Sequence, residues 1–200
     1  MRKIVVATKN TGKLKEIQYI MRDWPLELIS LEDVGLADLD IAETGTSFEA
    51  NALQKARAVK QHTDHAVISD DSGLSVDALN GEPGIYSARF GGDIPFSEKR
   101  QQLIDLLNWE KDRKAHFTCA IALIDEQGNE ITAEGRIDGV IAKEERGDHG
   151  FGYDAIFQVP DGRTFGEIEF EEKHNMSHRY HALEALREKL QDDENIRIFG

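Results

Sequence analysis

Short apolar runs alternate with segments of helical periodicity along this chain. Runs rich in β-branched residues predict four strands, at Lys3–Ala7, Leu26–Ser30, Ala66–Ser69 and Ala155–Val159. Apolar and polar residues also alternate in Ala115–Ile124 and Glu130–Ile141. Because every second side chain of a strand faces the same side, this alternation predicts two half-buried strands, and Glu126–Asn129 between them predicts a hairpin turn.

Apolar residues at helical spacing predict four helices. The first follows the first strand and places Leu14, Ile17, Ile20 and Met21 on one face. Thr46 and Glu49, a hydroxyl and a carboxylate three residues apart, form a capping box that opens a second helix reaching about Gln61. Ser97 and Ser177 are the predicted N-caps of two later helices. Their apolar faces carry Leu103, Ile104, Leu106 and Leu107 in one, and Ala182, Leu183, Leu186 and Leu190 in the other.

Strand and helix signals interleave from one end of the chain to the other, without repeats, low-complexity linkers or a sharp boundary. This order predicts a mixed α/β fold that contains both parallel crossovers and a hairpin. The 200 residues suit one domain, residues 1–200, with room for two lobes.

Composition narrows the function. A net charge of −14 argues against general nucleic-acid binding and against anionic membrane surfaces, although a few lysines and a metal can still bind a small polyphosphate. No apolar run approaches the ~20 residues of a membrane span, and the N-terminus has no signal-peptide pattern. The single cysteine, Cys119, excludes an internal disulfide, fits a reducing cytoplasm and is expected to be a core thiol.

The segment Thr8–Lys13 is the first candidate for chemistry. It is polar, follows a strand and leads into a helix, so its backbone N–H groups and the positive end of the helix dipole face one place. Lys9 and Lys13 add positive charge there, in an acidic chain. The pattern predicts a phosphate-binding loop.

Acidic residues form the second candidate. Asp70 and Asp71 directly follow a predicted strand, and adjacent carboxylates are natural Mg²⁺ ligands. An ordinary turn is the alternative, since Asp, Ser and Gly are common turn residues. Glu43, at the end of the acidic segment Asp38–Glu43, would complete a metal site if it lay near Asp71.

Two further clusters have mixed character. Gly147–Asp154 combines three glycines with Phe151 and Tyr153, which suits a flat, hydrogen-bonding ligand such as a nucleobase. A glycine-rich connection with aromatic side chains in the core is the alternative. The other cluster is Lys173–Arg179. His178 and Arg179 lie at the start of the last predicted helix, where positive charge opposes the helix dipole, and this suggests an anionic or carbonyl-rich ligand. A solvated helix start is the alternative there.

Taken together, these motifs resemble the noncanonical purine nucleoside triphosphate pyrophosphatases, the inosine/xanthosine triphosphatase family. The resemblance runs from residue 4 to about residue 190, with six motifs in the family's order. They are Thr8–Lys13, Glu43-Thr44-Gly45 before Phe48–Ala52, Asp70–Leu74, Pro83–Arg89, Gly150–Asp154 and Ser177-His178-Arg179. The sequence departs from the family at Ala155, where proline is common, and at Lys9, where glycine or asparagine is common.

The resemblance implies an elongated mixed sheet flanked by helices, with the site in a cleft between two lobes. It also implies a cytoplasmic, Mg²⁺-dependent homodimer that cleaves ITP, dITP and XTP to the monophosphate and pyrophosphate. Glu43 and Asp71 would bind the metal, and Asp71 would also accept a proton, whereas the share of Asp70 in the metal stays open. The implied substrate-binding residues are Thr8, Lys9, Asn10, Thr11, Gly12, Lys13, Ser72, Phe151, Gly152, Tyr153, Asp154, Lys173, His178 and Arg179.

The chemistry agrees with this set. Water must attack the α-phosphorus while charge grows on the leaving pyrophosphate, and Mg²⁺ with Lys13 would stabilise that charge. A donor such as Arg179, or a backbone N–H near His178, would favour the 6-carbonyl of hypoxanthine or xanthine over the amino group of adenine. Two other classes stay open: a different polyphosphate hydrolase, and a nucleotide-binding module without activity.

Overall fold

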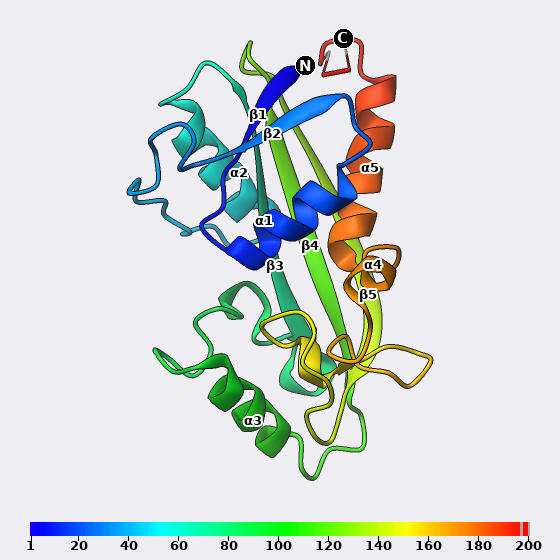
Figure 1. Ribbon diagram of the computed structural model, residues 1–200. Helices are drawn as coiled ribbons and strands as arrows, with labels where there is room; N and C mark the ends of the chain where they lie inside the picture. Colours follow the sequence, from blue (N-terminus) through cyan, green and yellow to red (C-terminus); the bar gives the residue numbers. More distant parts are fainter. Residues whose placement is uncertain (197, 200) are drawn as a thin grey trace. The chain divides into compact units, whose positions relative to one another are not determined.

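Figure 1 shows the computed structural model of the chain, which describes residues 1–196, 198 and 199. Its strands are β1 (Arg2–Val6), β2 (Leu26–Ser30), β3 (Ala66–Val76), β4 (Lys114–Ile124), β5 (Glu130–Ile141) and β6 (Phe157–Gln158). Its α-helices are α1 (Thr11–Ile20), α2 (Phe48–Lys60), α3 (Phe96–Leu106), α4 (Phe170–Lys173) and α5 (His178–Asp192). Short 3-10 helices occupy Asp77–Leu79, Gly84–Tyr86 and Asp154–Ile156.

The six strands form one mixed sheet in the order β2-β1-β3-β4-β5-β6. β1 pairs in parallel with β2 and β3, and β6 pairs antiparallel with β5. β4 and β5 are neighbours joined by only five residues, 125–129, which is too short for a crossover, so they form a hairpin. The predicted mixed α/β class is confirmed.

Contacts divide the chain into two compact units. The first unit comprises Met1–Asp71, Cys119–Gly135 and His178–Gly200, and the second comprises Ser72–Thr118 and Arg136–Ser177. The division falls within β3, β4 and β5, so each of these strands contributes residues to both units.

In the first unit, helices pack on both faces of the sheet (Figure 1). One face packs against α1 and α5, and the other packs against α2. Successive residues of β3 face opposite sides of the sheet: Ala66 and Ile68 pack on the α1/α5 side, and Val67 packs on the α2 side. Cys119 is fully buried on the α1/α5 side, which confirms the predicted core thiol, and burial raises its pKa to about 12.

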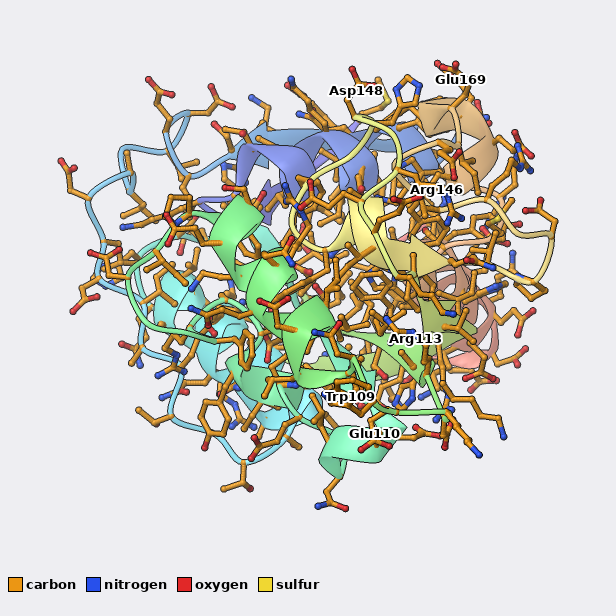
Figure 2. The ribbon with its side chains drawn as sticks, turned by 90° about the horizontal axis from the view of Figure 1, so that it is seen from below. Trp109, Glu110, Arg113, Arg146, Asp148 and Glu169 are labelled. Carbon is orange, nitrogen blue, oxygen red and sulfur yellow. The ribbon has the colours of Figure 1, made fainter. Side chains whose placement is uncertain are left out.

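The second unit has its own core, in which the rings of Phe117, Phe157 and Phe165 cluster. Helix α3 packs on this core through Leu103 and Ile104. Arg113 fixes the chain just after α3 by donating to the carbonyls of Leu107, Ile141 and Ala142 (Figure 2). No described helix is long and apolar enough to cross a membrane.

Several predicted boundaries were wrong. Strand β3 continues for seven residues beyond Ser69, so Asp70 and Asp71 lie inside a strand and neither in a loop nor in a turn. Helix α2 begins one residue later than predicted: Ser47 is its N-cap and accepts from the backbone N–H of Ala50.

Two later elements also differ from their predictions. Helix α3 starts at Phe96 after Pro95, without a side-chain cap, and Leu106 is exposed instead of buried. The predicted strand Ala155–Val159 is mostly a 3-10 turn followed by the two-residue β6. The short helix α4 had no predicted counterpart.

Candidate functional site

The two acids of β3 lie in different surroundings although they are adjacent in sequence. Successive side chains of a strand point to opposite faces of the sheet. Asp70 accordingly contacts Lys13 of α1 and Arg179 of α5, while Asp71 contacts Asn51 and Lys55 of α2. Both carboxyl groups are buried. The strand therefore builds two separate electrostatic environments from one dipeptide.

On the α2 side, Lys55 bridges two carboxylates. Its Nζ lies 3.1 Å from Oε1 of Glu43 and 3.9 Å from Oδ1 of Asp71. Asn51, one helical turn before Lys55, donates from Nδ2 to Oδ2 of Asp71 at 3.1 Å. The structure thus brings Glu43 and Asp71 to one cation, the proximity that sequence alone did not establish.

The loop before α2 is docked on that helix by side-chain amides. Oδ1 of Asn51 accepts from the backbone N–H of Gly45 at 2.7 Å, and Oε1 of Gln54 accepts from the N–H of Thr44 at 2.8 Å. Gly45 must be glycine, because a Cβ there would lie 2.8 Å from both Asn51 Oδ1 and Ala50 Cβ. These contacts place Glu43 beside Lys55.

The two acids also differ in acidity. Burial raises the pKa of Asp71 to about 6 and the charge of Glu43 adds to the rise, against the opposing influence of Lys55 and Lys13. Burial also opposes ionisation of Asp70, but Lys13, Arg179 and Lys55 outweigh it and hold its pKa well below the ordinary value. Asp70 is thus a permanent anion, whereas Asp71 can exchange a proton near neutral pH.

Asp70 belongs to a buried chain of charges that joins α1, β3 and α5. Lys13 Nζ lies 3.1 Å from Asp70 Oδ2, and Arg179 donates to the same oxygen at 3.0 Å. Arg179 also forms an ion pair with Glu16, and both of these side chains are almost fully buried. The cation at the start of α5 is thus balanced by Glu16 and Asp70, so the helix-dipole argument for a ligand at Arg179 no longer applies.

The segment Thr8–Lys13 leads from β1 into α1 as predicted, and its last three residues, Thr11–Lys13, are already helical. Asn10 is the N-cap, and its Oδ1 accepts from the backbone N–H of Lys13 at 3.1 Å. Thr8 Oγ1 accepts from the N–H of Asn10 at 3.1 Å. Lys9 points to solvent, and Lys13 is turned toward Asp70.

In the second unit, the structure brings together three of the predicted substrate-binding residues, Phe151, Asp154 and Lys173. Lys173 Nζ lies 2.7 Å from Oδ2 of Asp154 and 5.3 Å from the ring centroid of Phe151. Asp154 Oδ2 also accepts from the backbone N–H of Phe151 at 3.0 Å. Tyr153 behaves differently: its ring is in the core, and its hydroxyl donates to the carbonyl of Ser87 at 2.6 Å. The alternative of a core aromatic therefore holds for Tyr153.

The predicted site residues divide between the two units. Thr8–Lys13, Glu43, Asp71, His178 and Arg179 belong to the first unit, and Ser72, Phe151–Asp154 and Lys173 belong to the second. His178 is the first residue of α5 and is buried, and Ser72 is half-buried on β3.

Glu43 and Asp71 fit a magnesium ion by the chemistry of their donors. Mg²⁺ prefers carboxylate oxygens and is commonly held by one or two of them, with substrate phosphates and waters completing the shell. These two carboxylates already share one cation, Lys55. Among the described residues, no three His, Cys, Asp or Glu side chains form a metal-binding cluster, so waters or phosphates would have to complete the shell.

Sequence reasoning missed Asn51, Lys55 and Glu16. The sequence did contain a signal for Asn51 and Lys55. They are four residues apart in α2 and precede the apolar positions Ala52 and Ala56, so they fall on a helix face that is otherwise apolar. Polar residues at a buried helix face require partners. Glu16 gave no such signal, because its partner Arg179 is 163 residues away.

The sequence and the structure are both similar to those of known proteins. The sequence matches the model of the Ham1 family over residues 4–189. It is 42% identical over 200 residues to a dITP/XTP pyrophosphatase of Clostridium perfringens, covering 95% of this chain and 98% of that protein. A Bacillus subtilis dITP/XTP pyrophosphatase is also 42% identical, over 195 residues, covering 96% and 98% of the two chains. The structure of a HAM1 protein from Coxiella burnetii superposes with a TM-score of 0.86 at 39% identity and covers 96% of this chain and all of that one. The chain belongs to the Ham1 family.

Proposed function

We propose that this protein hydrolyses noncanonical purine nucleoside triphosphates, namely ITP, dITP and XTP, to the nucleoside monophosphate and pyrophosphate. One observation carries the proposal: Lys13 of the phosphate-binding loop is held by Asp70, and the next residue, Asp71, shares Lys55 with Glu43. A phosphate-binding cation and a pair of metal-type carboxylates thus occur on one strand and the helices beside it. The names of the relatives support the same activity.

In this proposal, Glu43 and Asp71 hold Mg²⁺, which when bound would neutralise charge on the phosphates. Asp71 either takes a proton from the attacking water directly or acts by holding that water in position. Its pKa of about 6 leaves it ionised at neutral pH and close enough to that pH for proton transfer. Lys13 and the N–H groups at the start of α1 bind the triphosphate with Thr8 and Asn10, and Lys13 stabilises the leaving pyrophosphate.

Ser72 is proposed to contact the substrate, and Phe151, Gly152, Asp154, Lys173 and the start of α5 are proposed to contact the nucleobase and ribose. Arg179 is bound to Glu16 and Asp70, so we favour a backbone N–H near His178 as the donor to the purine 6-carbonyl. Such a donor would face the amino group of adenine, and an unpaired buried donor costs about 1–3 kcal/mol.

We further propose that residues 1–200 act as one pyrophosphatase domain and that the protein is a cytoplasmic homodimer. Two units whose strands are shared fit one functional domain. The buried thiol of Cys119, without a second cysteine in the chain, fits a reducing compartment.

The decisive experiment compares ITP, dITP, XTP, GTP and ATP at equal concentration, with Mg²⁺ and with EDTA. IMP with pyrophosphate is the expected product of ITP, whereas IDP with phosphate would show a different polyphosphate hydrolase. Asp71→Asn should lose at least about a hundredfold in kcat. Asp64→Asn, the same change at an exposed position, is the matched control. A protein that binds ITP without turnover would show a binding module.

A further inference from the structure

The loop from Glu145 to Gly152 contains three glycines in the left-handed region. Gly147, Gly150 and Gly152 have φ values of 82°, 73° and 60°. Glycine adopts this region easily, but it also has the most conformational freedom to lose on folding. A loop of this composition keeps one conformation only where surrounding contacts fix it.

Part of the loop is fixed from within the second unit. Gly147 packs against Gly166, where a Cβ on Gly147 would lie 1.9 Å from the carbonyl oxygen, and His149 donates its N–H to that carbonyl at 2.9 Å. Asp148 points outward at the surface (Figure 2). The two ends, Glu145 and Gly152, meet a different element.

Arg100 of α3 binds both ends of the loop. Its Nε lies 2.5 Å from Oε1 of Glu145, and its NH1 donates to the carbonyl of Gly152 at 2.7 Å. The guanidinium is planar and presents its donors in fixed directions, so one side chain can hold two acceptors at a set separation. Only 18% of the Arg100 side chain is exposed, which limits competition from water.

Helix α3 is a firm support for this contact. Its residues Leu103 and Ile104 are buried in the core of the second unit. The ring of Phe96, at the start of the helix, packs edge-on against the ring of Tyr153 at 5.3 Å between centroids. The same helix therefore touches the loop on both sides of the peptide bond between Gly152 and Tyr153.

We propose that Arg100 is a positioning residue for nucleobase recognition: by binding Glu145 and the Gly152 carbonyl, it fixes the loop that carries Phe151 and ends two residues before Asp154. The inference rests on the proposed function, in which these two residues contact the base and ribose. Arg100 itself touches neither the phosphates nor the metal ligands in this scheme. Its loss should affect the binding and choice of the base more than the chemical step.

The test uses Arg100→Met, which keeps most of the apolar part of the side chain and removes the guanidinium group with its hydrogen-bond donors. We expect about a tenfold higher KM for ITP, kcat within about threefold of wild type, and a smaller ratio of kcat/KM for ITP over ATP; tenfold corresponds to ~1.4 kcal/mol. Arg100→Lys keeps the charge without the fork and should recover less than half of the loss on a logarithmic scale. Arg57→Met removes an exposed two-point contact with Glu130 and is the control, expected to leave all three values unchanged.

A substitution of Glu145 provides a second, independent experiment. If Glu145 acts by orienting Arg100, Glu145→Gln should show a weaker form of the same KM effect and add nothing to Arg100→Met. Hydrogen exchange of residues 147–153 in the nucleotide-free protein should rise in Arg100→Met and stay unchanged in Arg57→Met.

The outcomes separate the two proposals. Unchanged KM, selectivity and loop exchange in Arg100→Met would overturn the role of Arg100 and leave the proposed function standing. A loss confined to kcat, or additive effects of Glu145→Gln and Arg100→Met, would also overturn it. Absence of pyrophosphate release from ITP by the wild type would instead overturn the proposed function, and loop exchange would still decide whether Arg100 fixes the loop.

Discussion

Lys55 Nζ lies 3.1 Å from a carboxylate oxygen of Glu43 and 3.9 Å from one of Asp71, so a single ammonium group is the common counter-ion of both proposed metal ligands. Burial opposes the charge of Lys55, but Asp70, Glu43 and Asp71 outweigh it and raise its pKa. Lys55 and a magnesium ion would therefore act on the same two anions, and the first prediction follows from that.

Lys55→Met should lower the free energy of unfolding of the metal-free protein by about 3 kcal/mol, because two carboxylates lose their common counter-ion. Mg²⁺ should restore part of this loss, since no ammonium group shares the carboxylates with it. Thermal unfolding with 0 and excess Mg²⁺ checks this, and the Mg²⁺-induced increase in Tm should be larger in the variant than in the wild type.

The matched control is Lys60→Met on the same helix. Lys60 donates to the carbonyls of Thr63, Asp64 and His65, and none of its contacts is a proposed metal ligand. Its Tm should fall without any extra response to Mg²⁺. Equal Mg²⁺ increments in Lys55→Met and the wild type would contradict the shared-cation account.

The second prediction concerns pH. The pKa of Asp71 is about 6 in the folded protein against 3.8 for the ordinary group, so between these values the folded protein keeps a proton that the unfolded chain releases. The contribution of Asp71 to stability must then fall as the pH rises from about 4 to 6, by about 3 kcal/mol in total. Urea unfolding in EDTA should show this fall in the wild type relative to Asp71→Asn.

Asp161→Asn serves as its control, because hydrogen bonds from Arg163 lower the pKa of Asp161. Relative to this variant, the wild type should lose stability as the pH falls through the acidic range. If the stability difference between wild type and variant had a pH slope of the same sign for Asp71→Asn and Asp161→Asn, the raised pKa of Asp71 would be ruled out.

The third prediction tests the buried charge chain. Glu16→Gln removes a carboxylate partner of the fully buried Arg179, and the free energy of unfolding should drop by about 3 kcal/mol. Glu130→Gln removes the partner of Arg57 at the surface and should cost no more than about 1 kcal/mol. Equal costs in chemical denaturation would mean that the buried pair contributes no more than a surface pair.

The fourth prediction concerns Gly150. A Cβ at this position would lie 2.0 Å from Oδ2 of Asp154, so Gly150→Ala must displace Asp154 from Lys173 and from the N–H of Phe151. We expect the KM for ITP to rise about tenfold, equivalent to ~1.4 kcal/mol. Steady-state kinetics with ITP measures it.

Gly128→Ala is the control that tests backbone strain alone, without a clash between the new Cβ and a neighbouring side chain. Gly128 also has a positive φ, of 92°, but a Cβ there has no described neighbour within 4 Å. This variant should lose about 1 kcal/mol of stability and keep its KM. If both variants left KM unaltered, the position of Asp154 would have no part in substrate binding.

Local sequence patterns were sufficient to predict most of the helices and strands. Strand β2 has the predicted bounds, the hairpin of β4 and β5 follows from alternation, and α5 begins directly after Ser177. The continuation of β3 beyond Ser69 could not be predicted in this way, because it begins with four polar or small residues, Asp70–Gly73. They extend because neighbouring strands and buried cations supply their partners, and these come from distant parts of the sequence.

The same reason limits prediction of the candidate site. The residue types of the phosphate loop, Glu43 and Asp71 were visible in the sequence, and the structure places Glu43 and Asp71 at one cation. The role of Arg179 was not visible. Its partners Asp70 and Glu16 lie 109 and 163 residues away, so no local pattern reveals that the charge of Arg179 is already balanced.

The placement of Asp70 and Asp71 on opposite faces of β3 has a consequence for how the protein can change. Inserting one residue upstream in this strand would turn Asp70 toward α2 and put Ser69 in its place beside Lys13, whereas deleting one would turn Asp71 toward Lys13 and put Ser72 in its place beside α2. Either slip would leave a carboxylate on one side of the strand and a serine on the other. Length variation should therefore be tolerated in the connections around β3 and be prohibited between Ala66 and Asp71.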